Sequence, residues 1–255
     1  MKTLKTKILS TNLESTNYEQ VFSDILTFLN QKNDSAYITV NNVHTVVEGV
    51  VNAKYGEILN NSFQTLPDGR PLSIVASWKG DKQMQRVFGP TLMEKIIDWG
   101  QGHNIKHFFW GSTESTLDKM ETVIKKKYPK AVIAGTKSPP FRELSVKENQ
   151  EFLEKMNTSG ADIVWIGLGA PKQELWMSEH FKKLEKGIMI GIGAGFDYLA
   201  GNTSHAPDWM KKYALEWFYR LIQEPGRLWK RYLVTNTLFI VYLILEFLHI
   251  KKFNN

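Results

Sequence analysis

Asp68 is an acidic residue whose local sequence could support catalysis. It stands between Pro67 and Gly69. Proline presets one backbone dihedral angle and glycine accepts a positive φ, so this tripeptide is also typical of an ordinary turn. A carboxylate held in such a turn has a fixed direction and could remove a proton from a hydroxyl group. The residues alone leave both interpretations open, a structural turn and a general base.

Polar residues and glycines follow several short apolar runs that predict parallel strands. Ligands bind beyond the carboxyl ends of such strands. The residues at these ends are Thr39, Asn41, Asn42 and His44, then Gly111, Ser112 and Thr113, then Lys172, Gln173 and Glu174, and finally Gly193, Gly195 and Asp197. The helix expected after Ser112 could present backbone amides to a phosphate. Each segment alone is weak evidence, because a glycine after a strand also serves an ordinary tight turn.

The sequence lacks the motifs of several cofactor classes. The spacing of Gly191 and Gly193 begins a dinucleotide fingerprint, but Phe196 stands where the third glycine is required. No two aspartates are separated by one residue, and there is no cysteine to supply a thiolate ligand. His103 and His107 fit surface or packing positions better than a zinc site. We therefore expect no cofactor and no metal.

The elements that would position these residues follow an α/β pattern. Short apolar runs predict strands at 36–40, 105–110, 131–134, 162–168 and 187–192, and helical periodicity predicts helices at 18–29 and 113–128. Ser145 and Glu148 form a capping box that should open a helix reaching residue 156. The pattern predicts a Rossmann-like fold, a largely parallel sheet flanked by helices. We expect a core domain over 1–205 and a helical appendage over 206–255.

This C-terminal appendage carries most of the charge imbalance. From residue 210 onward there are eight Lys or Arg and three Glu, a net +5 of the total +6, and residues 233–250 are mostly apolar. Cationic, aromatic and apolar residues in this order are typical of a segment on an anionic membrane surface. The alternative is a basic helix packed on its own domain. Polar interruptions in the short run argue against a spanning helix, and Pro225 predicts a helix start after a bend near Glu224.

The remaining bulk properties bear on location and partners. The first seventeen residues lack the apolar core of a signal peptide, and the absence of cysteine suits a reducing cytosol. We expect a cytoplasmic protein associated peripherally with the inner face of the plasma membrane. The pI near 9.2 does not indicate nucleic-acid binding, because the charge lies in an apolar tail and no nucleic-acid motif is present. The apolar surface of the tail leaves room for a homo-oligomer.

Taken in order, several short segments resemble the WecG/TagA/CpsF family of bacterial glycosyltransferases. The segments are TVN at 39–41, LPDG at 66–69, RVFG at 86–89, GLGAPKQE at 167–174, FD at 196–197 with AG at 200–201, AP at 206–207, LEWFYR at 215–220 and EPGR at 224–227. The resemblance runs from about residue 18 to 231. Several blocks with the right separation are a far stronger signal than any one of them.

The resemblance implies a metal-independent, inverting glycosyltransferase. The donor would be a UDP-sugar, most simply of the N-acetylmannosamine type, and the acceptor a GlcNAc-type sugar on undecaprenyl diphosphate, for a cell-surface polysaccharide or teichoic acid. It implies that Asp68 is the general base, that Thr39 and Asn41 line its pocket, that Arg86 meets diphosphate charge and that Gln173 binds the donor. Alternatives are a uronic acid or another hexose donor for exopolysaccharide, capsule or O-antigen, and, more distantly, a non-catalytic nucleotide- or nucleic-acid-binding module.

Arginines in the tail are further candidates for the diphosphate. A guanidinium offers two parallel donors to a phosphate. Arg227 and Arg231 lie four residues apart, just after the helix start expected at Pro225, where basic side chains oppose the helix dipole. A bound anion would remove that conflict. We therefore expect Arg220, Arg227 and Arg231 to bind the diphosphate while the tail docks on the membrane, with headgroup contact alone as the alternative.

Overall fold

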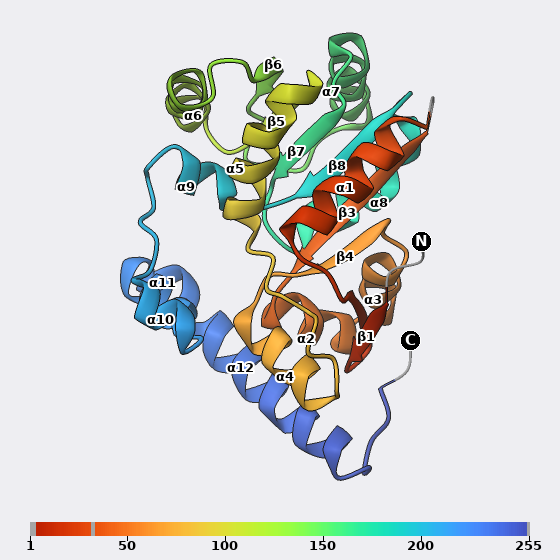
Figure 1. Ribbon diagram of the computed structural model, residues 1–255, viewed down its shortest axis with the longest axis vertical. Helices are drawn as coiled ribbons and strands as arrows, with labels where there is room; N and C mark the ends of the chain where they lie inside the picture. Colours follow the sequence, from red (N-terminus) through yellow and green to blue (C-terminus); the bar gives the residue numbers. More distant parts are fainter. Residues whose placement is uncertain (1–3, 32–33, 254–255) are drawn as a thin grey trace. The chain divides into compact units, whose positions relative to one another are not determined.

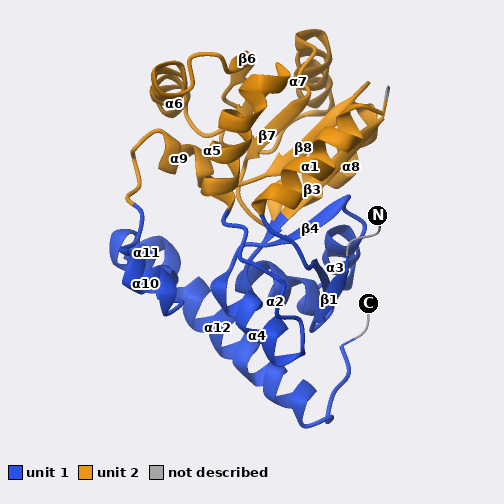
Figure 2. Cartoon of the chain, in the orientation of Figure 1, with its two compact units in different colours: residues 1–17, 40–88, 205–255 blue, residues 18–39, 89–204 orange. Residues whose placement is uncertain are grey.

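The computed structural model describes residues 4–31 and 34–253, and the chain forms two compact units (Figure 2). Unit 1 comprises residues 1–17, 40–88 and 205–255, and unit 2 comprises residues 18–39 and 89–204. Residues 206–255, predicted to form an appendage, therefore belong to the same compact unit as residues 40–88.

The main sheet confirms the predicted α/β class (Figure 1). Its strands are β3 (Ser35–Asn41), β4 (Gln64–Pro67), β5 (Lys106–Gly111), β6 (Val132–Lys137), β7 (Ile163–Gly167) and β8 (Gly187–Gly191). They run in the order β4-β3-β8-β7-β5-β6. The pairings of β3 with β8, β8 with β7, β7 with β5 and β5 with β6 are parallel. Their carboxyl ends, and the polar residues that follow, therefore lie at one edge of the sheet.

Helices cover the sheet of unit 2 on both faces, with α1 in front of β8 and α8 behind it in the view of Figure 1. The helices are α1 (Tyr18–Leu29), α5 (Gly89–Gly100), α6 (Glu114–Lys127), α7 (Val146–Ser159), α8 (Lys172–His180) and α9 (Gly195–Leu199), with single 3-10 turns η1 (Gln101–His103) and η2 (Phe181–Lys183). The capping box of Ser145 and Glu148 is present at the start of α7, as predicted. Pro171 caps α8 one position before its first residue.

Unit 1 begins with an antiparallel hairpin, β1 (Lys5–Ile8) and β2 (Thr11–Glu14). Helices α2 (Val43–Val51), α3 (Ala53–Asn60) and α4 (Arg70–Trp78) follow. The buried core of this unit joins the hairpin, α2 and α4 to the C-terminal helix. Its members are Ile8, Leu9, Leu13, Val46, Val47, Leu72, Val75, Ala76, Met84, Phe239, Leu243 and Phe253.

The tail forms three helices, α10 (Asp208–Lys212), α11 (Glu216–Gln223) and α12 (Pro225–Phe247). Glu224 separates the last two and Pro225 occupies the first turn of α12, which confirms the predicted bend. The residues of α12 that pack against unit 1 include Thr235, Phe239 and Leu243, while Glu246 pairs with Lys79 at 2.6 Å. Polar groups of α12 therefore face the protein, and many apolar side chains face outward.

Among the described residues, α12 has the length and composition to cross a membrane. It is one continuous helix of 23 residues, longer than the apolar run at 233–250 because it starts at Pro225. Leu228, Phe239 and Leu243 are nevertheless buried in unit 1. That the helix does not span therefore stays a prediction, consistent with one face being packed on the protein.

Candidate functional site

Asp68 follows β4 directly, and its main chain is fixed on both sides. Its N–H donates to the carbonyl of Asn41 at the end of β3, at 2.7 Å. Its own carbonyl accepts from Nε of Arg86 at 2.5 Å. The Asp68 side chain is 18% exposed. The carboxylate is thus partly shielded, with a backbone that two hydrogen bonds hold in place.

A turn at Pro67-Asp68-Gly69 was expected to hold its glycine at a positive φ, and this expectation is wrong. Gly69 has φ −76° and ψ 129° and stands as the N-cap of α4. A Cβ atom there would meet the Cα of Asn42 at 3.5 Å, an ordinary contact. Neither backbone conformation nor packing therefore demands glycine at this position. The motif is a strand-to-helix connection, in which Asp68 and Gly69 lie between the two elements.

Arg86 is held beside Asp68 by several contacts. The N–H of the next residue, Val87, donates to the carbonyl of Pro67 at 2.7 Å, which docks the segment on the end of β4. The guanidinium lies 4.5 Å from the ring centroid of Phe88, and its Nη2 is 4.0 Å from Oδ1 of Asp68. Its Nη1 forms an ion pair with Glu216 of α11. Some of the Arg86 N–H groups that were expected to bind a diphosphate therefore bind other groups of the protein.

Thr39 and Asn41 end β3, and both side chains are fully buried. Thr39 is in register with Gly191, the last residue of β8. The carbonyl of Asn41 accepts from the N–H groups of Asp68 and Gly69, at 2.7 and 3.3 Å. The structure thus brings Asn41 and Asp68 into direct contact through the backbone. Whether Thr39 and Asn41 touch a substrate stays a prediction.

His44 lies in the first turn of α2, which Asn42 caps with a capping box completed by Thr45. Burial, and then the positive charge of Arg231, lower the pKa of His44 to about 3. Its Nδ1 is 3.7 Å from Oε1 of Glu48. His44 is therefore neutral at pH 7, and the helix cap accounts for its position.

The three tail arginines differ in their partners. Arg227 forms an ion pair with Glu224, to which it also donates from Nε at 2.6 Å, and Nη2 of Arg220 lies 3.7 Å from the same carboxylate. Because Glu224 is the N-cap of α12, it offsets much of the predicted conflict with the helix dipole. Within residues 4–31 and 34–253, Arg231 has no ion pair. Its Nε is buried without a hydrogen bond.

The electrostatic state of Arg231 reflects this arrangement. Burial lowers the pKa of Arg231, and the positive charges of Arg220 and Arg227 lower it further, against the opposing effect of Tyr232. A partly buried guanidinium among like charges is stabilised by a bound anion. Among the described residues Arg231 is the tail arginine without an ion pair, and its contact with a phosphate stays a prediction.

In unit 2, Gln173 braces two glycine loops. Its Oε1 accepts from the N–H of Gly169, after β7, at 3.1 Å and from the N–H of Gly193, after β8, at 2.9 Å. Its Nε2 donates to the buried carboxylate of Glu174 at 2.7 Å. Both glycines have positive φ, +77° and +49°. The amide of Gln173 is thus largely used to shape the loops; contact with a donor stays a prediction.

The other predicted residues of unit 2 have local roles. Gly111 ends β5 against Gly167 of β7, where a Cβ atom would approach the backbone to 2.6 Å. Ser112 has φ +57°, and its carbonyl accepts from Oγ of Ser138 at 2.7 Å. Asp197 accepts from Nδ2 of Asn202 at 3.3 Å. Lys172, in the first turn of α8, is exposed and is the most available cation among them.

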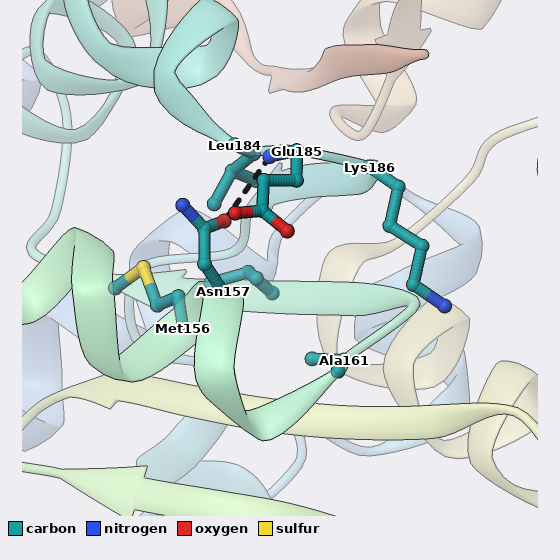
Figure 3. Close-up of a pocket in the computed structure, with 8 residues that line it drawn as sticks. Met156, Asn157, Ala161, Leu184, Glu185 and Lys186 are labelled. Carbon is teal, nitrogen blue, oxygen red and sulfur yellow. Dashed lines mark hydrogen bonds between the residues drawn. The ribbon is translucent and has the colours of Figure 1, made fainter. Parts of the chain in front are cut away.

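A cavity of about 90 Å³ lies elsewhere in unit 2 (Figure 3). It is lined by residues around the amino ends of β7 and β8, including Ala161, Leu184 and Lys186. The Oδ1 of Asn157 is occupied by the N–H of Glu185, at 3.1 Å. The candidate residues lie at the carboxyl ends of the same strands. This cavity is therefore separate from them. No group of three acidic or histidine side chains that could hold a metal occurs among the described residues.

Glu216 is the contact that residue-level reasoning missed. Glu216 pairs with Arg86, which lies 130 positions earlier in the chain. Helical periodicity indicated only that Glu216 belongs to a helix. Its presence in the shared LEWFYR segment at 215–220 was the available signal.

Comparisons with known proteins point in one direction. The family model described as "Glycosyl transferase WecG/TagA/CpsF family" matches residues 6–252. The chain is similar to an N-acetylglucosaminyldiphosphoundecaprenol N-acetyl-beta-D-mannosaminyltransferase of Bacillus spizizenii, with 29% identity over 81% of this chain and 78% of the relative. Proteins of the same name from Bacillus subtilis (27% identity, 81% and 78%) and Staphylococcus aureus strain MW2 (25%, 90% and 87%) are also similar.

Proposed function

The chain belongs to the WecG/TagA/CpsF family of glycosyltransferases, and from this premise we propose that it transfers N-acetylmannosamine from a UDP-sugar to GlcNAc on undecaprenyl diphosphate. The observation that carries the proposal is the partly shielded carboxylate of Asp68 beside Arg86, on a backbone that two hydrogen bonds hold in place. The names of the relatives supply the acceptor and the transferred sugar. The product is a lipid-linked disaccharide for a cell-surface polymer.

In this reaction Asp68 is the general base. It removes the proton from the acceptor hydroxyl as the oxygen attacks the anomeric carbon, which inverts that centre. The bond to UDP breaks, and negative charge grows on the diphosphate. Arg86 retains N–H groups beyond those that bind Asp68 and Glu216, since a guanidinium has five donors. We propose that these donors attract that charge without a metal ion.

Two further groups of residues support substrate binding. The loops after β7 and β8 are braced by Gln173, which binds the N–H groups of Gly169 and Gly193. Their other backbone amides and the exposed cation of Lys172 are offered to the donor diphosphate. Arg231, whose Nε lacks a hydrogen bond, binds the diphosphate of the lipid-linked acceptor. Arg220 and Arg227 share Glu224 and add positive potential there.

We expect purified protein to release UDP from UDP-N-acetylmannosamine only when a short-chain lipid diphosphate-GlcNAc acceptor is present. The rate should stay within about 2-fold after treatment with EDTA, because arginines and backbone amides carry the leaving-group charge. The measurement is a coupled UDP-release assay with a screen of donors that includes a uronic acid and other hexoses. Release of UDP without the acceptor, or turnover abolished by EDTA and restored by a divalent ion, would contradict the proposal.

The tail supports a peripheral membrane location on the cytoplasmic side. Apolar side chains of α10, α11, α12 and of the C-cap residues of α10 and α12 are exposed; they are Trp209, Tyr213, Trp217, Phe218, Ile222, Trp229, Leu233, Val234, Ile240, Val241, Ile244, Phe247 and Leu248. Lysines and arginines lie among them. Burying such a face in an anionic interface combines the hydrophobic effect with attraction to lipid charge. An acceptor anchored by a polyprenyl chain requires the enzyme at this surface.

Placing glutamates on this face should weaken membrane binding. Val234 and Val241 are seven residues apart on α12 and are 46% and 43% exposed. We expect Val234→Glu/Val241→Glu to reduce flotation with anionic vesicles by roughly 10-fold. The substitution removes two apolar side chains from the interface, and the new carboxylates are repelled by the anionic headgroups. The matched control is Val146→Glu in unit 2, where the valine is 86% exposed. Equal flotation of both variants would place the membrane contact elsewhere.

A further inference from the structure

The sheet of unit 2 has a position where a nucleotide is expected to bind. In the strand order β8-β7-β5-β6, the strand that follows β5 in the chain lies on one side, and the strand that follows β7 lies on the other. The chain therefore reverses direction between β5 and β7, and ligands of open α/β sheets bind beyond the carboxyl ends of strands at such a point. The loops after β7 and β8 have been proposed for the donor diphosphate. The base of the donor still lacks a contact.

The loop over 138–145, between β6 and α7, is anchored at this edge of the sheet. Near its start, Oγ of Ser138 donates to the carbonyl of Ser112, the residue after β5, at 2.7 Å. Near its end, Nη1 and Nη2 of Arg142 donate to the two carboxylate oxygens of Glu148, at 2.9 and 2.6 Å. Glu148 is itself part of the capping box of α7. The loop is thus tied both to the end of β5 and to the start of α7.

Phe141 lies between these two anchors, at the centre of a three-residue turn. The N–H of Arg142 donates to the carbonyl of Pro140 at 2.8 Å, which closes the turn around Phe141. The Phe141 side chain is 84% exposed. In the part of unit 2 that the structure describes, it is the one large aromatic side chain that is exposed. Packing in the core of unit 2 therefore does not account for an aromatic residue here.

The spacing of the strands matches the dimensions of a nucleotide. Neighbouring strands lie about 5 Å apart, so the carboxyl ends of β7 and β6, which flank β5, are separated by about 10 Å. An extended nucleoside diphosphate spans a comparable length between its base and its second phosphate. A diphosphate at the loop after β7 therefore allows the base to reach the loop that carries Phe141.

We propose that the ring of Phe141 is the platform on which the uracil of the UDP-sugar stacks. The inference deepens the proposed function and rests on its UDP-sugar donor. Every base has a π face, and stacking on an aromatic side chain is a common mode of nucleotide binding. The uracil does not react, so this contact is equally strong in the ground state and in the transition state. It should lower KM for the donor and leave kcat nearly unchanged.

The binding test compares UDP with inorganic pyrophosphate, by isothermal titration calorimetry without acceptor. We expect Phe141→Ala to weaken UDP binding by roughly 5- to 150-fold, the effect of losing one base–aromatic stack, and to keep pyrophosphate binding within about 2-fold. Phe141→Tyr should keep UDP affinity within about 3-fold. The matched control is Val146→Ala, since Val146 is 86% exposed at the start of α7; its UDP affinity should stay within about 2-fold. Unchanged UDP affinity in Phe141→Ala, or equal losses for UDP and pyrophosphate, would overturn the proposal.

The kinetic test uses a soluble short-chain acceptor. We expect Phe141→Ala to raise KM for the UDP-sugar by at least about 5-fold, with kcat within about 3-fold. An exposed aromatic side chain in a loop could instead contact lipid, so flotation with anionic vesicles is measured for the same variant and should equal that of the wild type. Reduced flotation with unchanged UDP affinity would assign the ring to the membrane and overturn the proposal. If wild-type protein binds no UDP, the proposed donor fails as well; if it binds UDP and Phe141→Ala binds equally, the stacking inference fails by itself.

Discussion

Replacing Asp68 with asparagine is expected to lower kcat by on the order of 10²- to 10⁴-fold, the range that a general base contributes. The amide keeps the size of the side chain, and the backbone bonds to Asn41 and Arg86 do not involve it. The fold should therefore persist while the proton acceptor is lost. The measurement is UDP release at saturating donor and acceptor, together with a thermal melt.

The control for this substitution is Asp208→Asn. Asp208 also belongs to unit 1, but its side chain is 97% exposed and pairs only locally, with Lys211 at 2.8 Å. An exposed pair of this kind contributes little to stability. We expect wild-type turnover and melting for Asp208→Asn. An Asp68→Asn enzyme with more than about a tenth of wild-type kcat would assign the base to another residue.

The sequence predicted the sheet of unit 2 well, because its strands are continuous apolar runs between glycine and polar residues. Residues 163–167 and 187–191 are examples, and both are buried on each face. It did not predict the hairpin β1–β2, whose turn holds Leu9 at φ +54° and no glycine. That turn is stabilised by burial of Leu9 in the core of unit 1, a tertiary effect.

Helix α2 shows why unit 1 was harder. Its sequence, VHTVVEGVV, is rich in β-branched residues that favour strands. The capping box of Asn42 and Thr45 starts the helix, and packing of Val46 and Val47 with Phe239 and Leu243 of α12 stabilises it. The packing partners lie almost 200 positions away, so local propensity could not reveal them.

The candidate site was predictable to a similar degree. Asp68, Asn41 and Arg86 were identified through the shared segments, and the structure joins them by direct backbone and side-chain contacts. The bracing role of Gln173 and the ion pair of Glu216 were not, since each depends on loops or helices whose approach is set by the fold. The shared segments thus named the candidate residues but not their contacts, and the part that each residue plays in catalysis stays a prediction.

A final expectation concerns the close approach of β5 and β7 at their carboxyl ends. Gly111 has φ +143°, and a Cβ atom there would lie 2.6 Å from the Cα and 2.7 Å from the carbonyl of Gly167, its partner in the sheet. Both clashing atoms are backbone and cannot rotate away. We expect Gly111→Ala to lower the free energy of unfolding by about 3–5 kcal/mol and the melting temperature by roughly 10 °C.

The control separates this clash from the effect of backbone conformation. Gly201, also in unit 2, has φ +74°, and nothing lies within 4 Å of a Cβ atom placed there. Gly201→Ala should therefore lose only about 1–2 kcal/mol, the penalty for a left-handed alanine. Thermal and urea unfolding of both variants provide the comparison. If the two losses agreed within about 1 kcal/mol, β5 and β7 could separate at little energetic penalty. The loops that follow them would then not owe their position to the contact between Gly111 and Gly167.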